Sequence, residues 1–145
     1  MFKHILVPVD GSPTSLQAVA KAAAMAKTFG SAVTVLCVID PYPFTGVGTD
    51  FSYGQTEYLS LAMAQARSSV HEAEAAFKAA GVSVEARVVE NQLPQDGILD
   101  TATELGVDLI VIGSHGRRGI QKFLLGSVTQ RVLAGVHIPV LVVRD

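Results

Sequence analysis

The feature that most constrains the fold is a regular alternation of short apolar segments with longer segments of helical periodicity. The apolar segments predict strands at residues 4–9, 32–39, 83–89, 108–112 and 138–143. Helices are expected between them, at residues 14–29, 56–80, 94–105 and 127–134. Strands that alternate with helices pair in parallel through right-handed crossovers. Several of the strands are apolar on both faces, so we expect an open, doubly wound α/β sheet with helices on both sides.

The connections between these segments carry clear start and stop signals. Ser12 followed by Pro13 predicts an N-cap and a proline in the first helical turn. Gly30 is placed to end the same helix. Residues 41–55 are rich in proline, glycine and aromatic side chains, which predicts a long loop. The sequence leaves open whether this loop is a lid, a partner surface or a variable connection.

Size and charge exclude several classes of protein. The 145 residues predict one domain that spans residues 1–145. A formal net charge of -2 provides no overall basic field, so nucleic acid is not an expected partner. No apolar run reaches the roughly 18 residues of a membrane span, and the first apolar run is too short for a signal peptide. We therefore expect a cytoplasmic protein that does not insert into a membrane.

The residues that follow the predicted strands mark the candidate ligand site. In open α/β sheets, ligands bind beyond the carboxyl ends of the strands, where the strand order switches. Asp10 follows the first strand, Asp40 follows the second, and a loop from Gly113 to Gly126 follows the fourth. Asp40 is more typical of a turn, so the first and fourth strands carry the stronger signal.

The loop after the fourth strand has the features of a phosphate cradle. Gly113 and Gly116 leave main-chain N–H groups open to close approach by a phosphate. Ser127 and Val128 open the last helix, whose dipole favours an anion there. Basic side chains add positive charge to the same loop, at Arg117, Arg118 and Lys122. Two simpler interpretations stay open, in which the glycines serve only turns and Ser127 is only the helix cap.

The spacing of these glycines carries a family resemblance. Gly113, Gly116, Gly126 and Ser127 follow the pattern Gly-x2-Gly-x9-Gly-Ser, which resembles the nucleotide motif of the universal stress protein family. The similarity continues through ILVPVDGS at residues 5–12, DLIVIGSHGRRG at 108–119, LLGSVTQRVL at 124–133 and PVLVVRD at 139–145. The resemblance implies a five-stranded parallel sheet of order 3-2-1-4-5, with the switch point between the first and fourth strands.

The resemblance also implies a set of contacts to ATP, because the chain retains every position of the motif found in ATP-binding members. The phosphates and ribose would lie on the glycine loop and the start of the last helix, at Gly113, Ser114, His115, Gly116, Arg117, Gly126, Ser127 and Val128. Main chain at Val38 would read adenine, and the walls of the pocket would be Pro8, Val9 and Ile112. The segment Gln92-Leu93-Pro94 departs from the Gly-x-Pro that the family often has there, which puts the ribose-side wall in doubt.

Two single-residue roles stay open. In the family Asp10 would contact the ribose or a phosphate-bound Mg²⁺, but a carboxylate at this position can also help to cap the following helix. A catalytic pair of Ser114 and His115 is poorly supported, because adjacent side chains rarely face each other and no GxSxG elbow is present. We assign no catalytic residue.

Three functions are compatible with these observations. The leading one is a homodimeric, ATP-binding regulator or sensor of the stress response, whose nucleotide state biases contacts with an unidentified protein partner. The alternative is a slow ATPase or nucleotidyl-transferring enzyme that uses the same site, although no clear general base is present beyond His115 and Asp10. The third is a nucleotide-free dimerisation module, which the intact glycine spacing disfavours.

The last strand indicates how two copies would associate. It runs from Ile138 to Val143 and would form an edge of the sheet. A flat apolar edge aggregates unless something covers it, and antiparallel pairing of two such strands in a two-fold homodimer covers both. The resemblance implies the same interface, and the alternative is a C-terminus that lies under a helix.

Overall fold

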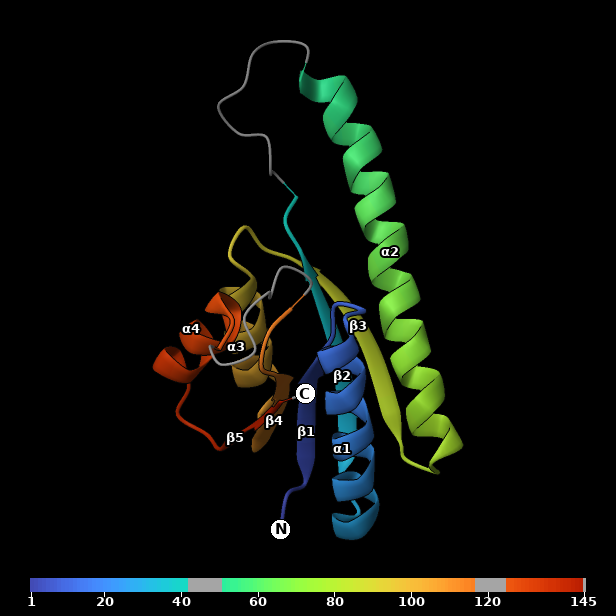
Figure 1. Cartoon of the computed structure of the whole chain (residues 1–145), viewed down its shortest axis with the longest axis vertical. Coiled ribbons are helices and arrows are strands. Elements are labelled where there is room, and N and C mark those ends of the chain that lie inside the picture. The colour runs from blue at the N-terminus through green and yellow to red at the C-terminus, as the bar shows by residue number, and fades with distance from the viewer. Residues whose placement is uncertain (42–50, 117–124, 145) are drawn as a thin grey trace.

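A five-stranded parallel sheet runs through the centre of the molecule, with strand order β3-β2-β1-β4-β5 (Figure 1). Its strands are β1 (His4–Pro8), β2 (Ala32–Ile39), β3 (Val84–Glu90), β4 (Leu109–Gly113) and β5 (Val140–Val143). The structure is a computed structural model, and it describes residues 1–41, 51–116 and 125–144. The predicted class and strand order are confirmed, with β3 and β5 at the two edges.

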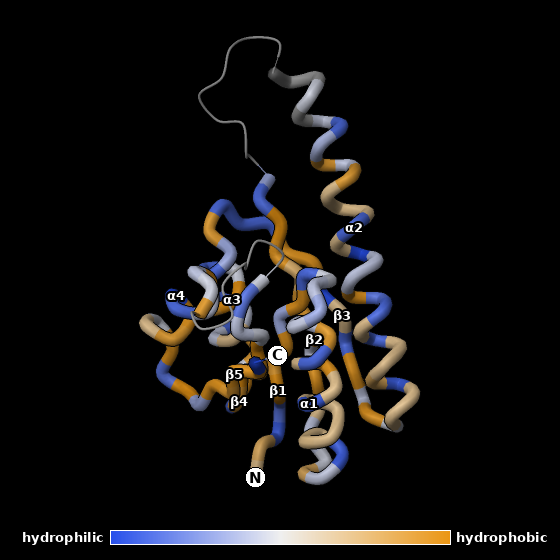
Figure 2. The backbone as a smooth tube through the Cα atoms, in the orientation of Figure 1, coloured by the Kyte–Doolittle hydropathy of each residue, from blue (hydrophilic) through white to orange (hydrophobic). Residues whose placement is uncertain are grey.

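Two helices cover each face of the sheet. The pair α1 (Pro13–Phe29) and α2 (Phe51–Ala79) lies on one side, and α3 (Pro94–Leu105) and α4 (Ser127–Gly135) lie on the other (Figure 1). Strand β1 serves both cores, because Ile5 and Val7 pack under α1 and α2 while Leu6 packs under α3 and α4. Figure 2 shows that hydrophobic residues are concentrated on the strands at the centre of the molecule. Burial on both faces explains why β1, β2 and β4 lack alternating polar residues, whereas the edge strand β3 has them.

The connection from β1 to α1 follows the predicted capping chemistry. The Ser12 hydroxyl accepts a hydrogen bond from the Ser15 main-chain N–H at 3.3 Å, and Pro13 is the first helical residue. Gly30 ends the helix in the left-handed conformation, with φ 67, and its N–H donates to the Ala26 carbonyl. These local signals place Asp10 and Ser12 together at the carboxyl end of β1.

Helix α2 begins earlier than the sequence indicates. The prediction of a loop that extends to residue 55 is wrong, because the helix already includes Phe51 and the four residues that follow. The glycine within this turn, Gly54, is exposed, and no atom of the part of the chain that the structure describes lies within 4 Å of the position of its Cβ atom, so a glycine is tolerated there. Residues 42–50 of the predicted loop lie outside the described residues. The helix extends well past the sheet (Figure 1).

The last strand is shorter than predicted. It begins at Val140 rather than at residue 138, and the Pro139 carbonyl accepts from the Ile110 N–H at 3.1 Å just before it. Proline has no N–H for a second ladder bond, which explains the later start. Among the described helices, none combines the length and the apolar character needed to cross a membrane.

Candidate nucleotide site

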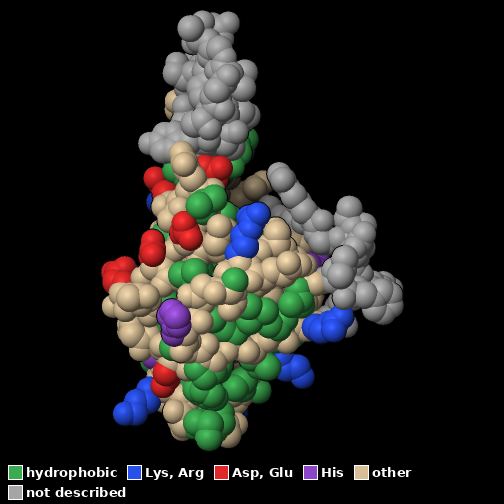
Figure 3. Space-filling view, turned by 90° about the vertical axis from the view of Figure 1, so that its left-hand side faces the viewer, with side chains coloured by type: hydrophobic (Ala, Val, Ile, Leu, Met, Phe, Trp, Pro, Cys, Tyr) green, Lys and Arg blue, Asp and Glu red, His purple; other side chains and the backbone are tan. Residues whose placement is uncertain are grey.

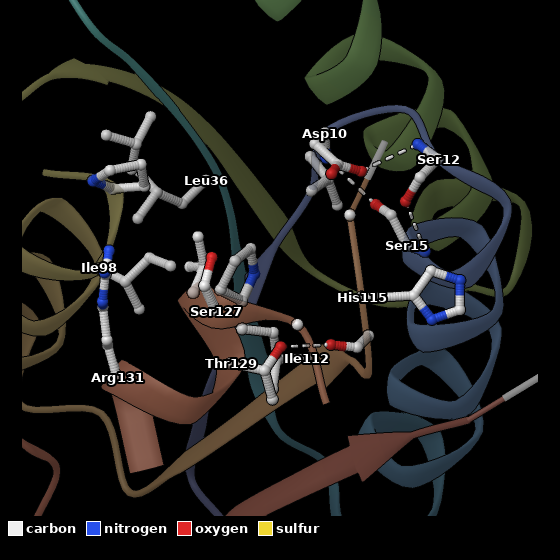
Figure 4. A pocket seen from close by; sticks show the side chains of 18 residues that line it. Asp10, Ser12, Ser15, Leu36, Ile98, Ile112, His115, Ser127, Thr129 and Arg131 are labelled. Atoms are coloured by element: carbon white, nitrogen blue, oxygen red, sulfur yellow. Dashed lines mark hydrogen bonds between the residues drawn. The ribbon is translucent and has the colours of Figure 1, made fainter. Parts of the chain in front are cut away.

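A cavity of about 510 Å³ lies at the carboxyl ends of β1 and β4, at the switch point of the sheet (Figure 4). One part of its wall is polar and is formed by Asp10, Ser12, Ser15, His115, Gly116, Gly126 and Ser127. The other part is largely apolar and is formed by Leu36, Val38, Pro94, Ile98, Ile112 and Val128. A volume of this size lies within the range of small-molecule sites, roughly 300–1,000 Å³. The division into a polar and an apolar part suits a ligand that carries both an anion and a planar base.

Most of the residues expected at the site meet at this cavity. Those that line it are Pro8, Val9, Asp10, Val38, Ile112, Gly113, His115, Gly116, Gly126, Ser127 and Val128. Ser114 does not line it, because its side chain is buried behind the loop. Arg117 lies outside the described residues.

Ser12, Pro94 and Thr129 also line the cavity, although the sequence marked them only as a helix cap, as part of the ribose-side wall and as a residue in the first turn of the last helix. Four further lining residues were not anticipated, namely Ser15, Leu36, Ile98 and Arg131. Two of them could have been found from helical spacing. Ile98 lies one turn after Pro94, and Arg131 lies one turn after Ser127. The signal for the others is weaker, because a strand or helix face cannot be assigned to the cavity before the packing is known.

The three glycines of the motif stand where a side chain would collide with its surroundings. A Cβ atom at Gly116 would lie 2.6 Å from Oδ2 of Asp10. At Gly126 it would lie 3.0 Å from the Cα of His115, and at Gly113 it would lie 3.1 Å from the main-chain carbon of Thr14. The interpretation that these glycines serve only turns does not account for such close approaches. Gly113 lets the end of β4 lie against Thr14 of α1, and Gly116 and Gly126 leave their main chain at the cavity.

Hydrogen bonds hold the two ends of this loop together. The Thr129 hydroxyl of α4 donates to the Gly113 carbonyl at 2.8 Å, and the Gly126 N–H donates to the Ser114 carbonyl at 2.6 Å. The Thr14 hydroxyl donates to the His115 carbonyl at 2.5 Å and ties the loop to α1. These bonds bring the end of β4 next to the start of α4.

The start of α4 has no side-chain cap. The N-cap residue is Gly126, in an extended conformation, and Ser127 is already the first helical residue. The interpretation of Ser127 as the cap of this helix is therefore wrong, since the chain turns into the helix one residue earlier. The first N–H groups of a helix have no partner within the helix, so those at the cavity are available to an anion.

Asp10 takes part in the turn into α1 and also lines the cavity. One carboxylate oxygen, Oδ1, accepts from the Ser12 N–H at 2.9 Å and stabilises the turn into α1. The Asp10 N–H donates to the Ser15 hydroxyl at 3.2 Å. The second oxygen, Oδ2, faces Gly116 across the polar part of the cavity. Within the described residues, no three His, Cys, Asp or Glu side chains form a metal-binding group.

The side chains of Ser114 and His115 do contact each other, contrary to expectation. The Ser114 hydroxyl lies 3.2 Å from Nδ1 of His115. The chain bends after β4, and Figure 4 shows the His115 imidazole over α1. Since the Ser114 hydroxyl is buried away from the cavity, this contact presents no nucleophile to a ligand.

The fold and the cavity together define an open, doubly wound α/β protein with a candidate ligand site between β1 and β4. Residues 1–144 match the model of the Universal stress protein family. The chain belongs to this family.

Individual relatives agree with this assignment. Universal stress protein MJ0531 of Methanocaldococcus jannaschii is 34% identical over 145 residues, which cover 99% of this chain and 83% of the relative. The structure of hypothetical protein MJ0577 has a TM-score of 0.86 at 30% identity and covers 100% of this chain and 97% of its own. A universal stress protein in complex with cAMP has a TM-score of 0.69 at 28% identity, covering 99% of this chain and 97% of its own.

Proposed function

We propose that this chain is an ATP-binding member of the family, which acts in the cytoplasm as a homodimeric regulator or sensor of the stress response. The observation that carries the proposal is the glycine cradle, in which Gly116 and Gly126 bring main chain to the cavity beside the uncapped start of α4. Nucleotide occupancy would alter the surface around the loop and so bias contact with a protein partner.

The shape of the cavity supports a bound adenine nucleotide. The phosphates fit the N–H groups at the start of α4, and the base fits the apolar part beside Val38 and Ile98. The family member crystallised with cAMP, at 28% identity, supports the same class of ligand.

Mg²⁺ fits this arrangement only together with the phosphates. Asp10 offers one carboxylate oxygen toward Gly116, and the described residues supply no complete set of metal ligands. Mg²⁺ commonly takes one or two carboxylates and completes its coordination with phosphate oxygens and water. Asp10 would therefore hold the ion at the phosphates, and the ion would offset the repulsion between this carboxylate and the anion.

The alternative function is a slow ATPase or nucleotidyl transferase at the same site. Asp10 and His115 both line the cavity and are its candidate bases. The Asp10 carboxylate already accepts from Ser12, and the His115 imidazole contacts Ser114, so neither is dedicated to orienting a water. We therefore favour nucleotide retention over turnover.

The test begins with the small molecule that accompanies the purified protein. The protein is denatured, the released compounds are identified by mass spectrometry, and stripped protein is titrated with ATP in the presence and absence of Mg²⁺. Bound ATP that stays intact over hours supports the proposal. ADP that accumulates with turnover supports the enzymatic alternative. If no nucleotide is released and the titration gives no signal, the nucleotide site is refuted.

The proposed homodimer uses the edge strand β5. Figure 3 faces α4 and β5, and shows hydrophobic side chains exposed on this side of the molecule. Leu133 of α4 and Leu141 of β5 have side chains that are 39% and 37% exposed. Pairing β5 with the β5 strand of a second copy would give hydrogen-bond partners to the main-chain N–H and C=O groups of this edge, and it would cover these side chains.

A further inference from the structure

Arg131 places a cationic side chain at the apolar part of the cavity. It is the only Lys or Arg among the described residues that line this cavity. In Figure 4 its side chain extends from α4 along Ile98, on the opposite side of the cavity from Asp10 and Ser12. The guanidinium is therefore separated from the polar part, where Asp10 faces Gly116.

The direction of this side chain is set by the packing of α4. Val132 is fully buried, and Thr129 is hydrogen-bonded to the end of β4 at 2.8 Å, so the rotation of the helix about its axis is fixed. Gln130 extends back to the Leu125 carbonyl at 2.6 Å. Residues four apart lie on the same face of a helix, which leaves Arg131 on the cavity side, one turn beyond Ser127.

Arg131 has no protein partner among the described residues. Arg87, by contrast, forms ion pairs with Glu85 at 3.1 Å and with Glu104 at 3.5 Å. The planar guanidinium has five N–H donors and no acceptor, and it stacks well on aromatic faces. At the apolar wall, such a group is suited to a ligand that presents a π-face or acceptor atoms at its edge.

We propose that Arg131 is a specificity-determining residue that recognises the purine base of the bound nucleotide. The inference rests on the proposed function, because it takes the phosphates to lie at the start of α4. The larger ring system of a purine extends further along the apolar wall toward Arg131 than a pyrimidine does. The guanidinium of Arg131 can then stack on the purine, or donate a hydrogen bond from one of its N–H groups to a ring nitrogen. Either contact favours ATP over CTP.

The test compares ATP, CTP and inorganic tripolyphosphate by calorimetric titration in the presence of Mg²⁺. For Arg131→Gln we expect the affinity for ATP to fall about tenfold, the size of a cation–π or charged contact, while that for tripolyphosphate stays unchanged. Arg131→Lys keeps the charge without the planar group and is expected to lose most of the same preference. Arg67→Gln on the exposed face of α2 makes the same chemical change far from the cavity and serves as the matched control.

The outcomes separate this inference from the proposed function. An unchanged ratio of ATP to CTP affinity in Arg131→Gln overturns the role of Arg131 while leaving the nucleotide site in place. An equal loss for tripolyphosphate also overturns it, since Arg131 would then contact phosphate. If the unaltered protein binds neither ATP nor tripolyphosphate, the proposed function itself fails.

Discussion

Gly97 of α3 packs directly against Val38 of β2. A Cβ atom at Gly97 would lie 2.7 Å from Cγ1 and 2.9 Å from Cγ2 of Val38. Val38 lines the apolar part of the cavity, and Ile98 follows Gly97 on the same wall. This contact therefore sets how closely α3 approaches the end of β2, and with it the width of the space proposed for the base.

Gly97→Ala tests this relationship. The added methyl group forces Val38 or α3 to move, and overpacking of this kind costs about 1–3 kcal/mol of unfolding free energy. We expect ATP affinity to fall with it, as measured by urea denaturation and nucleotide titration. Gly54→Ala is the matched control, because no described residue lies within 4 Å of its Cβ position and alanine favours the helix. If Gly97→Ala kept the full affinity for ATP, the width of the space proposed for the base would not be critical for binding.

Gly116→Val is expected to block the nucleotide and leave the fold intact. Gly116 is exposed, and among the described residues its Cβ would meet only the Asp10 carboxylate. Gly113→Val is a less selective change than Gly116→Val. Gly113 is buried, and its Cβ would press on the main chain of Thr14, so a loss of stability is expected as well. Circular dichroism and ATP titration of both variants check this, and unchanged ATP affinity in Gly116→Val contradicts the cradle.

Thr129→Val removes the buried hydrogen bond that joins α4 to the end of β4. The Gly113 carbonyl loses its side-chain donor, which costs about 1–3 kcal/mol of unfolding free energy. Weaker ATP binding should accompany the loss, because the helix start is no longer held against the strand. Thr103→Val, at an exposed hydrogen bond within α3, serves as the control and should change denaturation little. Equal stability of the two variants would argue against this anchor.

We expect the ionisation of Asp108 to contribute to the acid sensitivity of the fold. Burial raises the pKa of the Asp108 carboxyl, but hydrogen bonds from the main-chain N–H groups of Lys3 and His4 outweigh it, so the pKa lies below the ordinary value. A depressed carboxyl pKa adds stability above the unfolded value of about 3.9 and loses it as the pH falls through the folded value. Asp108→Asn should flatten the fall in unfolding free energy below about pH 4 relative to Asp100→Asn, an exposed control on α3. Parallel pH profiles would contradict this assignment.

Leu141→Lys is expected to convert the proposed dimer to a monomer. Leu141 is 37% exposed on β5, and a charge on an edge strand opposes pairing with a second edge. Removal of residues 138–145 is a poorer test, because Val143 is buried and its carbonyl accepts from Ser114 N–H at 2.8 Å. Light scattering after size-exclusion chromatography measures the mass. An unaltered dimer in Leu141→Lys would exclude pairing through this edge.

The sequence determined the order of elements, and the family resemblance supplied the strand order. Apolar alternation, Ser12-Pro13 and the helix-ending glycines are local signals, since each acts within a few residues of the chain. The spacing of Gly113, Gly116 and Gly126 marked the part of the cavity wall that lies between the end of β4 and the start of α4. The start of α2 was missed because glycine and aromatic residues are tolerated in an exposed helical turn, where propensity is a weak guide.

Only the tertiary structure decided which surfaces meet. Helical spacing places Ile98 on the face of Pro94 and Arg131 on the face of Ser127, but only the packing of α3 and α4 brings the two side chains to one wall of the cavity. The need for glycine at position 97 is equally invisible in the chain, because the atom that excludes a side chain belongs to Val38, on a different strand. Local signals set the conformation of each segment, whereas contacts between distant residues depend on how whole elements pack, and no short stretch of sequence contains that information.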